Sequence, residues 1–171
     1  WVSGTSYTAL DKVIYEHKIY ERIVTGVGTI TPDLDQVNWL DDGYTNRYRM
    51  FDNTLSSVSS RMGGIEFTLT PNQVINGIAL LSVNASTVRV VMTDPVDGVV
   101  YDRTKELRSS SNVIDYYSYF FAPLINLGDL DTAIFLDLPN KPTATITVYV
   151  SSGAGLVEVG EVVYGVQSIV G

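Results

Sequence analysis

Apolar and polar residues alternate along much of this chain with the period of two that is typical of β-strands. The alternation is clearest in residues 65–69 and 87–93. Residues 74–83 are almost continuously apolar, so we expect a strand at the centre of a sheet there. Further apolar runs cover residues 133–138, 144–150 and 157–164, with glycine or proline between them. No stretch has the 3.6-residue period of a long amphipathic helix.

The alternation predicts an antiparallel sandwich of about eight strands from residue 44 to the end of the sequence. Asp94-Pro-Val-Asp-Gly98 has turn chemistry and predicts a hairpin. The residues that alternation places inside the sandwich are Ile65, Phe67, Leu69, Ile78, Leu80, Val88, Val90, Ile146, Val148 and Val162. Residues 113–121 are rich in aromatic side chains, and we do not expect all of them to be buried.

The first 42 residues follow a different pattern, with many aromatic and few aliphatic side chains. Runs 12–15 and 18–24 predict a hairpin that turns at Glu16-His17, with Tyr20 and Arg22 on one face of the second strand. Residues 26–33 contain two glycines and a proline and are expected to form a loop. We therefore predict two units, a small aromatic β-module over residues 1–42 and a sandwich over residues 43–171.

The junction between these units, residues 39–52, combines turn residues with paired polar and aromatic side chains. Asp41-Asp42-Gly43 predicts a turn, with a strand directly after it. The polar side chains of the junction alternate with aromatic and apolar ones, and we expect them to be paired inside the sandwich or to line its rim. They are Asn46, Arg47, Arg49 and Asp52.

Charge and composition narrow the classes of partner. The chain has 171 residues, a formal net charge of -8, and 11 basic residues that are scattered singly. A nucleic-acid phosphate backbone requires a basic stripe, so no nucleic-acid partner is expected. Without a run of 18 apolar residues, no membrane insertion is expected. The absence of cysteine excludes disulfides and thiolate chemistry.

The titratable residues do not form a convincing catalytic set. His17, the only histidine, falls at the predicted hairpin turn, so a Ser-His-Asp arrangement would need a serine from the other unit. The carboxylate pairs lie where aspartate is favoured for turns, although acid/base chemistry on a glycoside or calcium binding are alternatives. These pairs are Asp41/Asp42, Asp94/Asp97 and Asp129/Asp131. We expect no enzyme, no catalytic residues, no metal ligands and no cofactor, with calcium as the open alternative.

The aromatic residues of the first 42 positions are the candidate binding residues. Sugar rings pack their C–H faces on aromatic rings while their hydroxyls bind polar groups, which is what exposed Trp and Tyr beside Asn and Asp provide. The candidate carbohydrate-binding residues are Trp1, Tyr7, Tyr15, Tyr20 and Trp39. The alternative is that some of these rings form the core of so small a unit.

These aromatic positions carry a resemblance to a known family. Their spacing resembles the small chitin-binding-type carbohydrate modules of the family 5/12 type, although Leu40 follows Trp39 where chitin binders usually have a second tryptophan. The matching positions are Trp1, Gly4-Thr5-x-Tyr7, Asp11-x-Val13-x-Tyr15, Tyr20, Thr31-Pro32 and Trp39. Modules of this pattern also occur in virion proteins of tailed bacteriophages, which implies a tail-associated role.

The second unit resembles the galactose-binding-like jelly rolls. The residues that carry this resemblance are 45–52, before the first core strand, and 160–165, with the pattern Gly-Glu-Val-Val-x-Gly. Together the two resemblances imply a non-catalytic structural component of a phage virion that presents a carbohydrate-binding module to host surface glycans. Its partners would be other virion proteins and host glycans, and we expect it to be an oligomer in the particle. The alternative is a purely structural adaptor or capsid decoration protein that binds neighbouring subunits.

Overall fold

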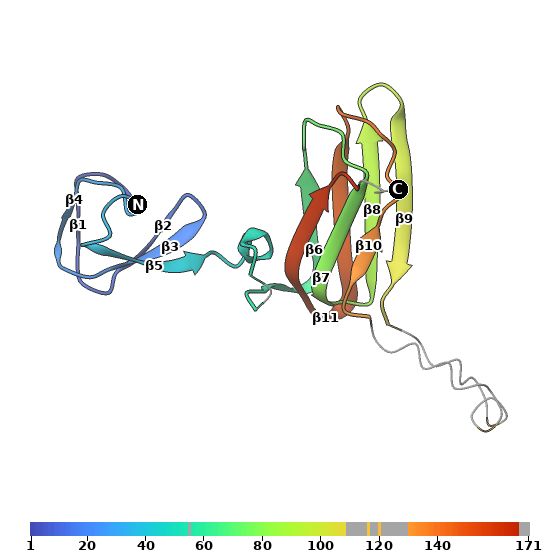
Figure 1. The fold of residues 1–171 in the computed structure, drawn as a ribbon. Helices are drawn as coiled ribbons and strands as arrows, with labels where there is room; N and C mark the ends of the chain where they lie inside the picture. Colours follow the sequence, from blue (N-terminus) through green and yellow to red (C-terminus); the bar gives the residue numbers. More distant parts are fainter. Residues whose placement is uncertain (55, 109–115, 117–119, 121–129, 168–171) are drawn as a thin grey trace.

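The structure is a computed structural model that describes residues 1–54, 56–108, 116, 120 and 130–167, and its fold is all-β (Figure 1). The first unit and the sandwich are separate bodies in Figure 1, connected by a segment that contains a short 3-10 helix, η1 (Arg49–Phe51). The strands of the first unit are β1 (Thr5–Tyr7), β2 (Lys12–Tyr15), β3 (Lys18–Arg22), β4 (Gly26–Gly28) and β5 (Trp39–Tyr44). They form a two-stranded sheet, β1-β4, and a three-stranded sheet, β2-β3-β5.

The predicted hairpin of the first unit is confirmed. Strands β2 and β3 pair in antiparallel register, and Glu16 and His17 turn the chain with φ values of 43° and 72°. Two consecutive positive φ angles produce the tight turn that matches the twist of a two-residue hairpin. Tyr20 and Arg22 are both buried, as their shared face predicts.

Two local predictions for the first unit were wrong. Asp41-Asp42-Gly43 is not a turn but part of β5, which pairs with β3 through an irregular register between Lys18 and Tyr20. Gly43 has a φ of 89°, so its positive φ serves a bulge inside a strand. The loop predicted over residues 26–33 begins with β4, because the edge of β1 offers its backbone partners there.

The strand predicted directly after residue 43 is also absent. Residues 45–52 turn sharply instead, with backbone hydrogen bonds from Tyr48 N to Thr45 O (2.8 Å) and from Phe51 N to Tyr48 O (3.0 Å). Met50 is buried in the core of the sandwich and Phe51 packs against it, so these two apolar side chains hold the turn against the sheet. The alternation of polar and aromatic residues that suggested a strand therefore reflects a turn with one side packed and the other exposed.

The jelly-roll sandwich is antiparallel, as predicted, but it has six strands in the described residues where about eight were predicted. They are β6 (Ser59–Leu69), β7 (Gly77–Asn84), β8 (Thr87–Asp94), β9 (Gly98–Glu106), β10 (Ala133–Phe135) and β11 (Thr145–Gly165). The runs 144–150 and 157–164, predicted as two strands, belong to the single long strand β11, whose register shifts between Ser151 and Leu156. Beyond this shift β11 exchanges its partner β8 for β7, while β6 follows it on the other side. The sheet thus folds over itself into two layers.

The core lies between these layers and matches the prediction from alternation. Leu80, Val88, Val90, Ile146 and Val148 are completely buried, and Ile78 and Val162 are nearly so. The three predicted residues of β6 pack against this core but keep part of their surface exposed. These are Ile65, Phe67 and Leu69, and their partial exposure marks the position of a groove described below.

The predicted β8–β9 hairpin is present. Strand β8 ends at Asp94 and β9 begins at Gly98, whose φ is 73°. The aromatic run 113–121 lies outside the described residues except for Tyr116 and Phe120, which are both exposed. Within the described ranges, no helix has the length and apolar character to cross a membrane.

Candidate functional site

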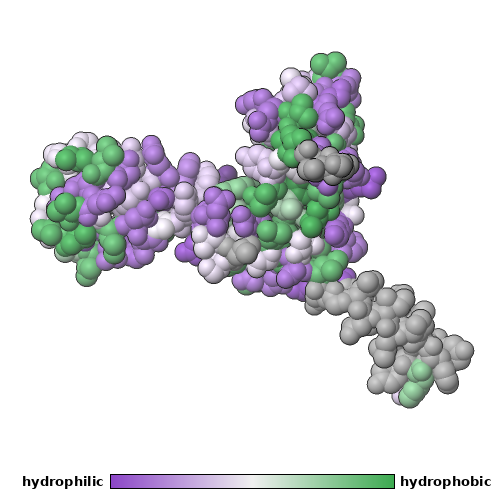
Figure 2. Space-filling view, viewed as in Figure 1, coloured by the Kyte–Doolittle hydropathy of each residue, from purple (hydrophilic) through white to green (hydrophobic). Residues whose placement is uncertain are grey.

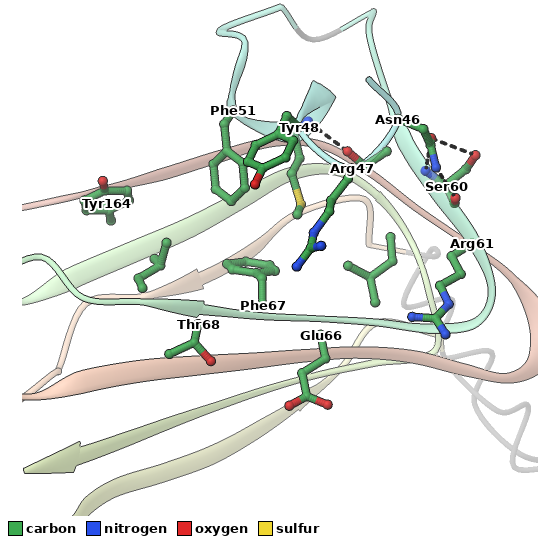
Figure 3. Close-up of a pocket in the computed structure, with 14 residues that line it drawn as sticks. Asn46, Arg47, Tyr48, Phe51, Ser60, Arg61, Glu66, Phe67, Thr68 and Tyr164 are labelled. Atoms are coloured by element: carbon green, nitrogen blue, oxygen red, sulfur yellow. Dashed lines mark hydrogen bonds between the residues drawn. The ribbon is translucent and has the colours of Figure 1, made fainter. Parts of the chain in front are cut away.

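A groove of about 780 Å³ opens between the start of the sandwich and the segment that precedes it (Figure 3). Residues 46–51, here called the roof segment, lie over one side of strand β6, which forms the floor. Tyr164 from the end of β11 lies at one end of the groove, and Arg61 of β6 lies toward the other. The groove is therefore built by two segments that are close in sequence, the roof and β6, and by the distant end of β11.

The roof segment is fixed to β6 by hydrogen bonds. The Asn46 amide donates to the Ser60 carbonyl (2.8 Å) and accepts from the Ser60 backbone N–H (3.0 Å). The backbone N–H of Met50 donates to the Ser59 hydroxyl (2.9 Å), and Ser59 is buried. Because all three bonds join the roof to the first residues of β6, the groove is formed before any ligand arrives. A preformed site spends less conformational entropy on binding.

Aromatic rings form much of the wall. Phe51 of the roof and Phe67 of the floor meet edge to face, with ring centroids 5.6 Å apart. Tyr48 lies on the roof and stacks on His17 of the first unit, with centroids 3.8 Å apart. Tyr164 also lines the groove and keeps 43% of its surface exposed. Its ring is therefore accessible to a ligand.

The polar groups of the groove include two exposed arginines, Arg47 and Arg61, and one carboxylate, Glu66. In Figure 3 Arg47 points from the roof toward the floor, whereas Glu66 extends from β6 on the side opposite Phe67. Neighbouring residues of a strand face opposite sides, which accounts for the separation of Glu66 and Phe67. Aromatic rings beside planar hydrogen-bond donors can pack on a flat ligand and bind its polar edge.

Two of the predicted carbohydrate-binding residues are core residues of the first unit. Trp39 is 2% exposed and Tyr20 is 5% exposed. The Trp39 ring contacts Tyr7 edge to face at 5.1 Å, and the Arg22 guanidinium lies 4.8 Å from its centroid. Burial raises the pKa of the Tyr20 phenol. A unit of this size needs large rings for its own core, and these two offer no open face to a ligand.

The other three predicted residues, Trp1, Tyr7 and Tyr15, are partly exposed. Trp1 and Tyr15 meet edge to face at 5.7 Å, and the Trp1 amino group donates to the Ile14 carbonyl (3.0 Å). The Tyr7 hydroxyl is occupied by the backbone of Val2, from whose N–H it accepts a hydrogen bond (2.8 Å). These rings thus help to hold the N-terminal segment, and only the Trp1–Tyr15 pair leaves a shared aromatic surface partly open.

The acidic pairs considered for catalysis or calcium have other partners. Asp41 and Asp42 accept from Lys18 and Lys12, at 2.7 Å in each case. Asp94 is buried and accepts from the turn, and Asp97 pairs with Lys141. Asp129 lies outside the described residues. In the part of the chain that the structure describes, no three acidic, histidine or cysteine side chains are placed to hold a metal ion.

The sequence pattern identifies the roof segment as part of a junction, but it does not predict that these residues form a groove with β6 and Tyr164. The expectation that the junction's polar residues pair or line a rim holds for Asn46, which is paired, and Arg47, which lines the groove. Phe67 was assigned to the core by alternation, whereas Arg61 and Tyr164 carried no signal at all. Arg61 pairs with Val157 of β11, whereas Tyr164 of β11 pairs with Ile78 of β7, and local pattern specifies neither pairing.

The sequence matches no family model and no curated protein. A solved structure with a related arrangement is the F5/8 type C domain of a Bacteroides fragilis protein. It has 9% sequence identity and a TM-score of 0.45, over 71% of this chain and 82% of that chain. Similarity at this level says nothing about function, and the fold described above rests on strand pairing.

Proposed function

We propose that this protein is a non-catalytic carbohydrate-binding protein whose ligand lies in the groove between the roof segment and β6. The observation that carries the proposal is the combination of an exposed ring, Tyr164, with guanidinium groups on the walls of a preformed groove. Stacking on the ring would supply affinity, and the planar donors would orient the hydroxyls of the sugar.

The small number of carboxylates in the groove supports a function in binding a glycan without hydrolysing it. Glycoside hydrolysis generally uses a pair of carboxylates on either side of the scissile bond. Among the described residues that line the groove, Glu66 is the only carboxylate. His17 stacks on Tyr48 and so belongs to the contact between the two units.

The proposed setting is the virion of a tailed bacteriophage, in a tail-associated protein that contacts host surface glycans. Support for this setting comes from the aromatic spacing of residues 1–39, which resembles modules found in such proteins. A single groove of this kind is expected to bind weakly. Several copies around a tail would raise the apparent affinity, because a second linked contact forms at high effective concentration.

Replacing Tyr164 with alanine tests the proposal. Tyr164→Ala should weaken glycan binding about two- to tenfold, the scale of an aromatic contact beyond area burial. Tyr149→Ala is the matched control, because Tyr149 lies on the same strand with 36% exposure but does not line the groove. Glycan-array screening followed by affinity electrophoresis in the retained polysaccharide measures both variants. Equal loss in the two variants, or no retained glycan, contradicts the proposal.

A second candidate function is subunit assembly through the first unit. Large apolar side chains are exposed on it, and Figure 2 shows them as several green patches. Exposed apolar surface of this kind marks protein interfaces. The residues are Val2, Leu10, Ile14, Ile23, Val24, Val27, Ile30, Leu34, Val37 and Leu40. Sedimentation of the full chain as a concentration-dependent oligomer without glycan binding would favour an adaptor or decoration role.

A further inference from the structure

Some basic residues of this chain form ion pairs with carboxylates, and others do not. The protein has 19 acidic and 11 basic residues, so internal carboxylates outnumber the cations that they can pair with. Among the described residues, six cations have a carboxylate within 4.0 Å. They are Lys12, Lys18, Arg22, Arg89, Arg103 and Lys141.

The other five basic residues have no such carboxylate among the described residues, and two of them, Arg47 and Arg61, line the groove. Over the described ranges, neither guanidinium has a hydrogen-bond, ion-pair or ring partner. The chain has a net charge of -8, so it has more carboxylates than cations to pair with. A shortage of acidic residues therefore does not explain why two guanidiniums in the same groove are unpaired. Their placement keeps donor groups available at the surface of the groove.

The hydrogen bonds between Asn46 and Ser60 join the two segments that carry these arginines. Arg47 follows Asn46 in the roof, and Arg61 follows Ser60 in β6, so each arginine is adjacent to one end of the cross-link. Figure 3 shows Arg61 at the end of the groove away from Tyr164, with the Arg47 side chain between the two, beside Phe67. The backbone positions of the pair are thus fixed, while their side chains remain exposed.

We infer that the ligand is an acidic glycan, whose sugar carboxylates are bound by Arg47 and Arg61 while a sugar ring packs on Tyr164. This inference deepens the proposed function and rests on it. A guanidinium presents donors in a planar fork that matches a carboxylate, and such charge-assisted hydrogen bonds are stronger than neutral ones. Glu66, the one acidic residue of the groove, points away from the floor that Phe67 occupies (Figure 3).

Because the protein is acidic overall, it can bind an acidic glycan only through short-range contacts. A protein with a charge of -8 opposes the approach of a polyanion, and at physiological salt this general repulsion is screened beyond the Debye length of about 8 Å. Retention of an acidic polymer therefore has to come from local contacts and cannot be attributed to general attraction. Neutralising the two arginines should abolish it.

The test compares polygalacturonate with the same polymer after chemical reduction of its carboxyl groups. In affinity electrophoresis of the full chain, we expect polygalacturonate to retard the protein at about a tenfold lower concentration than the reduced polymer. The double variant Arg47→Gln/Arg61→Gln should lose this preference. Lys105→Gln, which removes a cation outside the groove, should retain it. Arg61→Lys keeps the charge without the fork and should show intermediate retardation.

Each contrary outcome has a distinct meaning. Equal retardation by both polymers that depends on Tyr164 would overturn the acidic ligand and leave the proposed carbohydrate function standing. The inference also fails if the glutamine variant keeps the preference, or if poly-glutamate retards the protein as strongly as polygalacturonate. Retardation by neither polysaccharide, with the wild-type chain folded by circular dichroism, would overturn the acidic ligand, and a blank glycan array would then overturn the proposed function as well.

Discussion

Burial of single residues separates the aromatic side chains of this protein into structural and exposed groups. Trp39 and Tyr20 are nearly inaccessible, whereas Tyr164 keeps 43% of its surface exposed. The first two rings stand at conspicuous spacings in the sequence, and the third does not. A ring contributes to ligand binding only through a face that it does not already use for packing.

Trp39 is buried, so replacing it with alanine should destabilise the fold of the first unit and should not act as a selective loss of glycan binding. We expect a loss of about 3 to 5 kcal/mol, as for other large buried aromatic residues. Both tryptophans of the chain, Trp1 and Trp39, lie in this unit, so the fluorescence of Trp1 reports on its unfolding. Urea unfolding of the variant measures the effect. Tyr15→Ala, at a partly exposed ring, should cost less, and an equal cost would contradict the packing described here.

At the scale of elements, the β8–β9 hairpin depends on one buried carboxylate. Asp94 accepts hydrogen bonds from the Thr143 hydroxyl (2.9 Å) and from the backbone N–H groups of Val96 (3.0 Å) and Asp97 (3.1 Å). The Thr143 hydroxyl and then these two N–H groups hold the pKa of Asp94 below its ordinary value of 3.8. The hairpin turn and the chain before β11 are thus joined through the ionised form of Asp94.

This linkage predicts how stability changes with pH. A folded-state pKa below the unfolded one means that the Asp94 contribution is fully present above pH 3.8. The contribution is lost as the pH falls from there through the lowered pKa. Urea unfolding between pH 7 and pH 2 should show a smaller acid-dependent loss for Asp94→Asn, and also for Thr143→Val, which removes the leading hydrogen bond. An unchanged pH slope in both variants would show that Asp94 is not linked to folding.

At the scale of the whole molecule, the sandwich contains its own core. Every buried member of its hydrophobic cluster lies at residue 50 or beyond. Contact between the sandwich side and the first unit includes the His17–Tyr48 stack and a hydrogen bond from Thr45 N to His17 O (2.8 Å). These contacts position the first unit without supplying core residues to the sandwich.

A fragment of residues 43–171 should consequently fold alone. We expect far-ultraviolet circular dichroism typical of β-structure and a single cooperative thermal transition, because the apolar burial of the sandwich is retained. The transition temperature should lie within several degrees of the corresponding transition in the full chain. Loss of cooperativity would mean that the first unit is needed for the sandwich to fold.

The sequence by itself determined the all-β class, the β2–β3 and β8–β9 hairpins, and the inward face of the sandwich strands. These features depend on side-chain alternation and turn residues, which act between neighbours along the chain. Tertiary structure alone decided that residues 145–165 form one strand and that Asp41–Gly43 lie within β5. It also decided that Arg47, Arg61 and Tyr164 share a groove. Pairing between strands that are not neighbours in the sequence decides these features: β5 pairs with β3, and β11 pairs with β6, β7 and β8. The pairing of β6 with β11 joins residues about 80 to 100 positions apart, and alternation along one strand does not determine which strand is its partner.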